Sequence, residues 1–297
     1  MQPCISIIVP SYQGGLFLEQ AIQSILSQEY PAIELIVIDG GSTDNSLEIL
    51  QKYEKSLAFW VSELDQGQSD AINKGFARAT GEIVTFLSSD DTYAPGAFAH
   101  VAVQFAQQPQ TGAVIGAFQF QDEASRLVSE PVFPRLESPS PCDLTLLDPA
   151  TYRLHQIATF YSRRTLEQAG FWVRKDLHYV MDRELLYRVC AAFPLVLTNQ
   201  VYGWFRKHAL SKSEHAILPF AEEFASLYLQ SMDGNAQKDY LRARHARYLR
   251  ASGWLKFARA TRQSGPAISA LLRALFIWPG FLFHYSYISA WRRVLTA

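Results

Sequence analysis

Short apolar runs alternate with helical patterns along the first hundred residues, and this alternation is the feature that most constrains the fold. The runs cover residues 5–9, 34–38, 57–61 and 83–87. They are apolar almost throughout, which is typical of strands that are buried on both faces. Between them, apolar residues recur every three or four positions, as they do on the buried face of a helix. The pattern therefore predicts right-handed crossovers and an α/β fold with a doubly wound, mostly parallel sheet.

Local signals set the expected ends of these elements. Pro10 follows the first apolar run and is expected to stop that strand. Asn45, with Glu48 three residues later, predicts a capping box at the start of the second helix. Pro95 predicts the start of a further helix, because proline is favoured in the first helical turn.

Each predicted strand is followed by a polar cluster. The clusters are residues 10–13, 39–42, 63–67 and 88–91. Ligands of doubly wound sheets bind beyond the carboxyl ends of the strands. All four clusters are therefore expected to line one rim of the sheet.

The overall charge balance argues against a nucleic-acid partner. The chain has 27 Lys and Arg against 28 Asp and Glu, so it lacks the strongly basic character of nucleic-acid-binding proteins. Its three cysteines form no closely spaced pair that would indicate a metal or redox site, which fits a reducing compartment. The first residues do not have the pattern of a signal peptide. A cytoplasmic location is expected.

The length predicts a main domain with an appended region. We expect an α/β domain over residues 1–215 and a helical C-terminal region over 216–297. Residues 274–291 carry no formal charge and include Pro279–Gly280, which would interrupt a spanning helix. Two interpretations of residues 266–297 stay open: contact with a membrane surface, favoured by tyrosine, tryptophan and flanking arginine, or a helical pair packed on the protein.

Asp90 and Asp91 follow the fourth predicted strand. A buried carboxylate pair is costly unless a cation or hydrogen bonds compensate it. Mg²⁺ or Mn²⁺ suits this position, because such ions bridge protein carboxylates to substrate phosphates. The alternative interpretation of the pair is an acidic helix cap.

Asp39 and Tyr12 suggest a nucleobase site. Asp39 ends an apolar strand and is followed by Gly40, which allows a ligand close to the backbone. Its carboxylate would accept hydrogen bonds from a base edge, and the Tyr12 ring would stack on the same base. The alternative is that both segments are ordinary turns.

Three segments taken in order resemble glycosyltransferase family 2: residues 6–12 (SIIVPSY), 37–44 (VIDGGSTD) and 86–91 (FLSSDD). The resemblance extends over about residues 4–212. It implies a GT-A fold, an inverting mechanism, a divalent metal and a nucleoside-diphosphate sugar donor, with UDP favoured. The residues that the resemblance places at the nucleotide are Pro10, Tyr12, Gln13, Asp39, Gly40, Ser42, Asp65, Gln68, Asn73 and Asp90.

The resemblance also assigns roles outside the nucleotide pocket. It implies that Asp91 and His208 bind the metal and that Asp182 is the catalytic base, which removes the proton from the acceptor hydroxyl. Arg206 and Lys212 are candidates for contacts with the diphosphate. His155 is a candidate substrate contact. The alternative for Asp182 is a helix cap, and the alternative for the segment that begins at Arg206 is a solvated basic turn.

The predicted function is sugar transfer to a saccharide or lipid-linked acceptor in polysaccharide or cell-envelope glycan synthesis, at the inner face of the membrane. Two other functional classes are alternatives. A sugar nucleotidyltransferase usually has a glycine-rich basic loop after its first strand, whereas no Lys or Arg precedes Lys52. A non-catalytic nucleotide-sugar binding module would need no base, so Asp182 together with Asp90 and Asp91 favours an enzyme.

Overall fold

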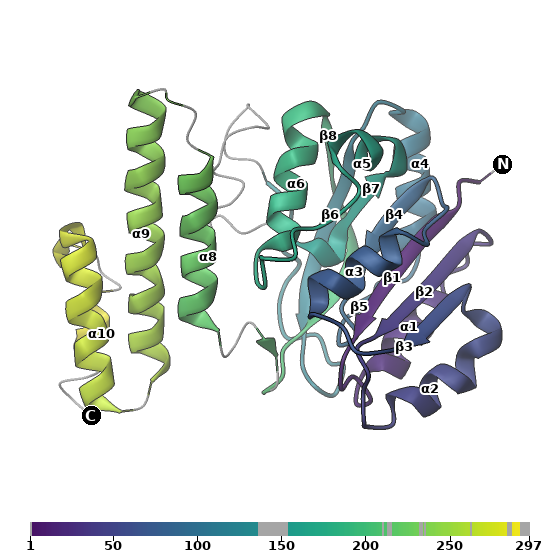
Figure 1. Ribbon diagram of the computed structural model, residues 1–297, viewed down its shortest axis with the longest axis horizontal. Helices are drawn as coiled ribbons and strands as arrows, with labels where there is room; N and C mark the ends of the chain where they lie inside the picture. The colour runs from purple at the N-terminus through teal and green to yellow at the C-terminus, as the bar shows by residue number, and fades with distance from the viewer. Residues whose placement is uncertain are drawn as a thin grey trace. The chain divides into compact units, whose positions relative to one another are not determined.

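The computed structural model describes residues 2–135, 154–209, 211–212, 216–231, 234, 236–261, 263–283 and 287–291. The chain divides into two compact units, Met1–His208 and Ala209–Ala297, whereas the sequence predicted a boundary after residue 215. The first unit holds an eight-stranded sheet with helices on it, and the second is helical (Figure 1).

The strands of the first unit are β1 (Ile5–Ser11), β2 (Ile33–Asp39), β3 (Phe59–Ser62), β4 (Ile83–Phe86), β5 (Thr92–Tyr93), β6 (Ala113–Gln121), β7 (Thr159–Ser162) and β8 (Leu195–Arg206). The helices are α1 (Leu18–Leu26), α2 (Ser46–Tyr53), η1 (Glu54–Ser56), α3 (Gln68–Phe76), α4 (Ala97–Gln107), η4 (Gln156–Ala158), α5 (Arg163–Ala169) and α6 (Met181–Ala192). The four strands predicted in the first hundred residues are all present.

The strand order is β3-β2-β1-β4-β7-β6-β8-β5. The half built from β3, β2, β1 and β4 is parallel, as predicted. The other half is mixed, because β7 runs antiparallel to β4 and β6, while β6 and β8 are parallel. The carboxyl ends of β1 to β4 therefore lie at one edge, as the predicted rim requires.

The expected end of β1 at Pro10 was wrong. β1 continues to Ser11, and Pro10 lies opposite Ile38 of β2. On its other side, β1 is paired with β4 only as far as Ile8. The missing N–H of Pro10 falls where no strand is paired on that side, so proline is tolerated inside this strand.

The predicted capping box of α2 was also wrong. Asn45 occupies the N-cap position, but its side chain makes no capping hydrogen bond. Asp44 acts instead, since its Oδ1 accepts a hydrogen bond of 3.0 Å from the backbone N–H of Ser46. Its Oδ2 accepts a second bond, of 2.8 Å, from the backbone N–H of Gly15. The carboxylate thus joins the loop after β2 to the loop after β1.

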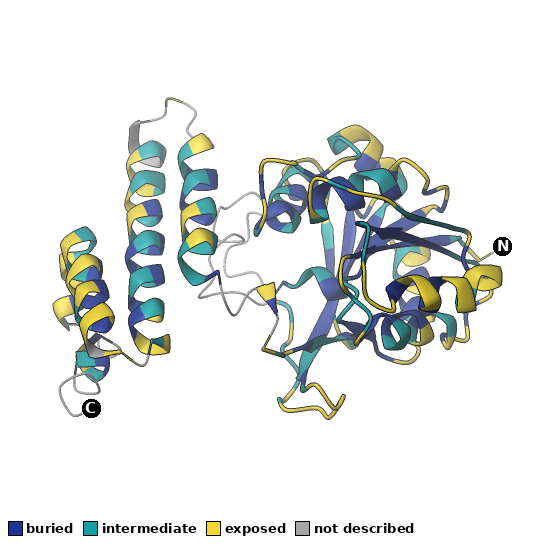
Figure 2. Ribbon diagram, turned by 60° about the horizontal axis from the view of Figure 1, so that its bottom comes forward, coloured by how far each residue is buried: buried dark blue, intermediate teal, exposed yellow. Residues whose placement is uncertain are grey.

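The sheet is covered on both faces, and its strands β1 and β4 are buried along their whole length (Figure 2). Ile7 and Val9 of β1 belong to a core cluster that includes Ile22 of α1 and Phe98 of α4. Ile8 points to the opposite face, where α3 lies against β1. Because alternate residues of β1 face different helices, the apolar run of this strand is explained by burial on both sides.

Gly75 of α3 lies directly against β1, and we expect Gly75→Ala to destabilise the protein by about 1–3 kcal/mol. A Cβ at position 75 would lie 2.3 Å from Cγ2 of Ile8, so the helix would have to move away from the sheet. This cost exceeds the gain in helix propensity of about 1 kcal/mol. Thermal unfolding measures the effect. Gly265→Ala is the matched control, because a Cβ there meets nothing within 4 Å; equal stability of both variants contradicts the packing described.

The second unit is built on α8 (Ile217–Gln230), α9 (Ala236–Ala260), α10 (Ser264–Ile277) and the short η5 (Pro279–Phe283). Helix α9 packs against both α8 and α10, and the three helices lie side by side in Figure 1. The predicted helical C-terminal region is confirmed. Within the part of the chain that the structure describes, no helix combines the length and the apolar character that a membrane span requires.

Candidate functional site

Direct hydrogen bonds bring the loops after β1 and β2 together. The backbone N–H of Gly40 donates to the carbonyl oxygen of Ser11 over 2.8 Å. The backbone N–H of Gln13 donates to Oγ of Ser42, also over 2.8 Å. Gln13 has a φ of +52°, a left-handed conformation that is uncommon for a residue with a side chain. Its side-chain amide donates to Oγ1 of Thr43 over 3.0 Å, which holds the turn against the second loop.

Asp39 lies at the end of β2, and its carboxylate is fully buried. Oδ2 accepts hydrogen bonds from the backbone N–H groups of Gly41 and Ser42 and from Oγ of Ser62, at 3.2, 2.9 and 2.7 Å. Oδ1 accepts one from Oγ of Ser42 at 2.5 Å. Asp39 therefore fixes the loop after β2 and ties it to β3. Its contact with a base edge stays a prediction, and Ser62 is a partner that the sequence did not indicate.

Tyr12 presents its ring at the same rim. It follows β1 directly and has a relative exposure of 66%, which is high for an aromatic side chain. Leu64, in the loop after β3, is also exposed, at 87%. Tyr12 follows Ser11, which lies opposite the buried Asp39 in the sheet, and its exposed ring is suited to stacking on a planar base. Pro10 lies near the end of β1, two residues before Tyr12, and it is buried.

The loop after β3 reaches the same edge of the sheet. Oδ1 of Asp65 accepts a hydrogen bond of 2.7 Å from the backbone N–H of Gly67. A Cβ at Gly40 would lie 2.8 Å from Oδ2 of Asp65, so the lack of a side chain at Gly40 lets the two loops approach closely. Gln68, the first residue of α3, has its side-chain amide nitrogen 3.4 Å from Oγ of Ser88, which follows β4. All four predicted clusters thus meet at one rim.

Asn73 has a structural contact that the sequence did not indicate. Its amide nitrogen donates to the carbonyl oxygen of Val173 over 2.8 Å, and its Oδ1 accepts from the N–H of Val173 over 2.7 Å. One turn earlier on α3, Oγ of Ser69 donates to the carbonyl oxygen of Leu177 over 2.8 Å. These bonds hold the segment before α6 against α3. A contact between Asn73 and the nucleotide stays a prediction, and its amide is already engaged within the chain.

Asp90 and Asp91 follow β4 and are held by the end of β8. Oδ1 of Asp91 accepts a hydrogen bond of 2.8 Å from the backbone N–H of Arg206. Nε2 of His208 lies 2.9 Å from Oδ2 of Asp90, and the His208 ring packs on Phe17 with 4.8 Å between centroids. Asp91 is 4% exposed, whereas Asp90 is partly open to solvent. The structure therefore brings Asp91 and His208, the two residues predicted to bind the metal, close to Asp90, which was predicted to lie at the nucleotide.

The electrostatics of this group favour a cation. Burial raises the pKa of the Asp91 carboxyl well above its usual range, and the neighbouring charge of Asp90 raises it further. A divalent ion would relieve both unfavourable effects. Among the described residues, no group of three or more His, Cys, Asp and Glu side chains is arranged to hold a metal ion by itself. Mg²⁺ and Mn²⁺ commonly take only one or two protein carboxylates and complete their coordination with phosphate oxygens and water, so the residues present fit a metal that is bound together with a diphosphate.

Arg206 is placed inside the protein rather than on the rim. Its guanidinium donates to the carbonyl oxygens of Asp90 and Asp122 over 2.8 and 3.1 Å, and to Oε1 of Gln20 over 2.7 Å. It also lies over the ring of Phe17, 4.6 Å from the centroid. The residue is fully buried. A contact between Arg206 and a diphosphate stays a prediction; in this structure the guanidinium fixes the backbone of the Asp90–Asp91 segment.

Asp182 lies in the first turn of α6, at position two of the helix. Its side chain is 17% exposed, and its Oδ2 is 3.9 Å from Nε of Arg183. The negative charge of Asp182 contributes to the raised pKa of Tyr161, after burial, so the two side chains are near each other. Tyr161 donates to Oε1 of Gln156, and Gln156 donates to the carbonyl oxygen of Phe86 at the end of β4, over 3.2 Å in each case. This chain of contacts connects Asp182 to the carboxyl end of β4. Its role as the base stays a prediction.

His155 packs among aromatic rings. Its ring centroid lies 4.7 Å from that of Phe118 and 4.8 Å from that of Phe205. Nδ1 accepts a hydrogen bond of 3.3 Å from the backbone N–H of Ile157, which caps η4. His155 therefore has a structural role in this structure. Its contact with substrate stays a prediction, as does the diphosphate contact of Lys212, which belongs to the second unit.

The surroundings of His155 predict a pH effect on stability. Burial, assisted by the charge of Arg183, lowers the pKa of His155 to about 3. The unfolded chain takes up a proton near the ordinary pKa of about 6.5, so the free energy of unfolding falls as the pH drops from about 6.5 towards 3, by up to about 1.4 kcal/mol per pH unit. We expect His155→Asn, which keeps a capping acceptor, to have a shallower acid dependence in urea unfolding. Equal slopes for the two proteins contradict this account.

The chain is similar in sequence and in fold to known glycosyltransferases. Residues 6–170, more than half of the chain, match Glycosyl transferase family 2. The poly-β-1,6-N-acetyl-D-glucosamine synthase of Staphylococcus epidermidis is 24% identical over 230 residues, which are 72% of this chain and 55% of that protein. Curated relatives with identities of 36–45% match over only 36–38% of their own length.

Two solved structures share the fold over almost the whole chain. S. aureus TarS in complex with UDP-GlcNAc gives a TM-score of 0.59 at 19% identity, and the match covers 98% of this chain and 90% of that one. The mannosyltransferase PcManGT from Pyrobaculum calidifontis, in complex with GDP-Man and Mn²⁺, gives a TM-score of 0.60 at 20% identity, over 99% of this chain and 88% of that one. Both likenesses show the GT-A fold expected from the sequence. With more than half of its length matched, the chain belongs to glycosyl transferase family 2.

Proposed function

We propose that this protein transfers a sugar from a nucleoside-diphosphate sugar, UDP-linked by preference, to a saccharide or lipid-linked acceptor. The observation that carries the proposal is the position of Asp90 and Asp91, held by β8 at the same rim as the exposed Tyr12 and the buried Asp39. Tyr12 and Asp39 suit the base of the nucleotide, and Asp90 and Asp91 suit a diphosphate with its cation. The UDP-GlcNAc complex of TarS, a protein of the same fold, supports the choice of donor.

The reaction is an inverting group transfer. The acceptor hydroxyl oxygen attacks the anomeric carbon and forms the new glycosidic bond, while the bond from that carbon to the diphosphate breaks and its electron pair leaves with the phosphate. Asp182 takes the hydroxyl proton as general base. Asp91, Asp90 and His208 would hold Mg²⁺ or Mn²⁺, which supplies positive charge to the leaving diphosphate. The Mn²⁺ complex of PcManGT supports the use of a metal.

The biological role that we propose is synthesis of a polysaccharide or cell-envelope glycan on the cytoplasmic side of the membrane. The similarity to a poly-N-acetylglucosamine synthase supports a role in polysaccharide synthesis. Binding of a free nucleotide sugar without turnover would instead make the protein a binding module.

Donor-dependent thermal stabilisation tests the proposal. UDP-, GDP-, dTDP- and CMP-linked sugars are added with and without Mn²⁺, and the unfolding midpoint is recorded. We expect one nucleotide class to stabilise the protein in a Mn²⁺-dependent way, by about 2.7 kcal/mol at a ligand concentration one hundred times the Kd. A protein that responds to none of the donors, with or without metal, does not have the proposed activity.

A further inference from the structure

The two units of the chain carry opposite charge. Residues 209–297 contain 12 Lys and Arg against 5 Asp and Glu, a formal charge of +7, whereas residues 1–208 contain 15 against 23, a formal charge of −8. The whole-chain value of −1 hides this difference. A strongly basic helical unit is attracted to negatively charged surfaces.

Helix α10 is apolar on its outer side as well as its inner side. Ala270, Leu271 and Ala274 are buried in a cluster with α9. Leu272 and Phe276, four residues apart and therefore on one face, are exposed at 53% and 88%. Helix α10 thus packs on α9 through one face, and its second apolar face, with Leu272 and Phe276, is exposed. Exposed apolar faces of this kind mark interaction sites.

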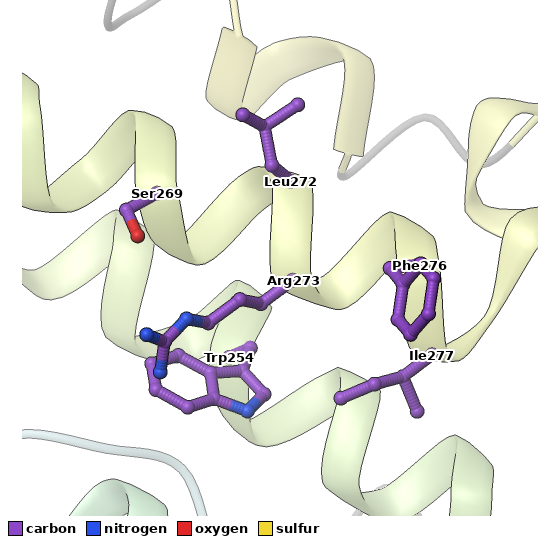
Figure 3. Close-up of a pocket in the computed structure, with 6 residues that line it drawn as sticks. All are labelled: Trp254, Ser269, Leu272, Arg273, Phe276 and Ile277. Atoms are coloured by element: carbon purple, nitrogen blue, oxygen red, sulfur yellow. The ribbon is translucent and has the colours of Figure 1, made fainter.

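A groove of about 600 Å³ lies along this face. It is lined by Trp254, Ser269, Leu272, Arg273, Phe276 and Ile277. Figure 3 shows the Arg273 side chain over the indole of Trp254, with the guanidinium carbon 4.7 Å from the ring centroid. Phe276 and Ile277 lie on α10, the helix that carries Arg273, whereas Trp254 lies on α9.

Further arginines lie at the end of the apolar face. The guanidinium of Arg244 lies over the ring of Trp278, 5.6 Å from its centroid. Arg247 donates to the carbonyl oxygen of Ile277 over 3.5 Å. Both arginines are exposed, as is Arg273. Protein surfaces that lie at the headgroup level of a bilayer are typically rich in tryptophan and phenylalanine, with arginine next to them.

We propose that this face, formed by Trp254, Leu272, Phe276 and the arginines 244, 247 and 273, binds the surface of an anionic lipid bilayer. The apolar side chains enter the boundary between headgroups and acyl chains, and the arginines contact lipid phosphates. Pairing of this face with the same face of a second chain is less favourable, because it would bring two units of charge +7 together. The proposal goes beyond sugar transfer and does not depend on it.

Vesicle flotation with the full-length protein tests the proposal. Vesicles contain either phosphatidylcholine alone or phosphatidylcholine with phosphatidylglycerol. We expect the protein to float with the anionic vesicles only and to be released by high salt, because screening weakens the attraction. Phe276→Ser should weaken vesicle binding about tenfold. Arg244→Gln should weaken it about fivefold.

Val103→Ser is the matched control, since Val103 is an exposed apolar residue (48%) on α4 of the first unit. It should bind vesicles as the wild type does. Circular dichroism melting of each variant shows whether the fold is intact. The proposal is overturned if the wild type does not float, if it binds neutral vesicles equally well, or if Phe276→Ser binds as tightly as the wild type. It is also overturned if light scattering shows a dimer that Phe276→Ser dissociates, because the face would then join two copies of the chain.

Discussion

Replacing Asp182 with asparagine is expected to lower kcat by roughly a hundredfold to ten-thousandfold while donor affinity stays unchanged. Asparagine has nearly the same shape but cannot accept the hydroxyl proton. The side chain is partly open to solvent, at 17%, and it lies in the first turn of α6. Its neighbour Tyr161 is connected through Gln156 to the end of β4. Donor affinity should be preserved because Asp182 lies on α6, whereas the proposed contacts with the base come from the loops after β1 and β2. Release of the nucleoside diphosphate gives kcat, and calorimetry gives the donor Kd.

Asp176→Asn is the matched control for this variant. Asp176 lies in the segment before α6, is 65% exposed and pairs with Arg174. Its replacement should leave turnover within about twofold, because an exposed ion pair contributes 1 kcal/mol or less. If Asp182 acts only as an acidic residue of the helix start, Asp182→Asn should lower stability by about 0.3–1 kcal/mol and leave turnover intact. That result would remove Asp182 from the mechanism.

Replacing Arg206 with alanine is expected to lower the free energy of unfolding by about 3–5 kcal/mol. The buried guanidinium donates to the carbonyl oxygens of Asp90, Asp122 and Glu123, and its loss removes one donor from each of them. Arg206→Lys should recover only part of the loss, because a single ammonium cannot replace a planar fork of donors. Urea unfolding of the three proteins measures the differences.

Arg126 provides the control for Arg206. Its side chain is 79% exposed and pairs with Asp122, so Arg126→Ala should cost no more than about 1 kcal/mol. The opposite pattern is informative too. If Arg206→Ala keeps full stability but no longer binds the donor, then Arg206 acts on the diphosphate, as its sequence position first suggested, and its buried contacts are not those of the protein in solution.

The parallel half of the fold could be predicted because its signals are local. The runs at 5–9 and 34–38 lie within β1 and β2, and the glycines and aspartates that follow them indicate a rim without any knowledge of tertiary contacts. Asp90 and Asp91 could be assigned to that rim in the same way. The prediction was wrong at single positions such as Pro10. Proline is tolerated inside β1 because the pairing with β4 ends before that residue.

The remaining features depend on contacts between residues far apart in the chain. Arg206 meets Asp90 across 116 positions, and Asn73 meets Val173 across 100. A basic residue near a histidine carries no local sign that it will be buried. An asparagine on a helix likewise carries no sign that its amide will bind a distant backbone. The charge difference between the two units is present in the sequence, but it can be assigned to separate parts of the protein only once the boundary between the units is known.

An anomalous-scattering map from crystals grown with UDP and Mn²⁺ would locate both the metal and the nucleotide. We expect a manganese peak at the Asp90, Asp91 and His208 side chains, shared with the diphosphate, and a uracil ring against Tyr12 near Asp39. A manganese peak away from Asp90 and Asp91, or UDP bound elsewhere than the rim formed by the ends of β1 to β4, would contradict it.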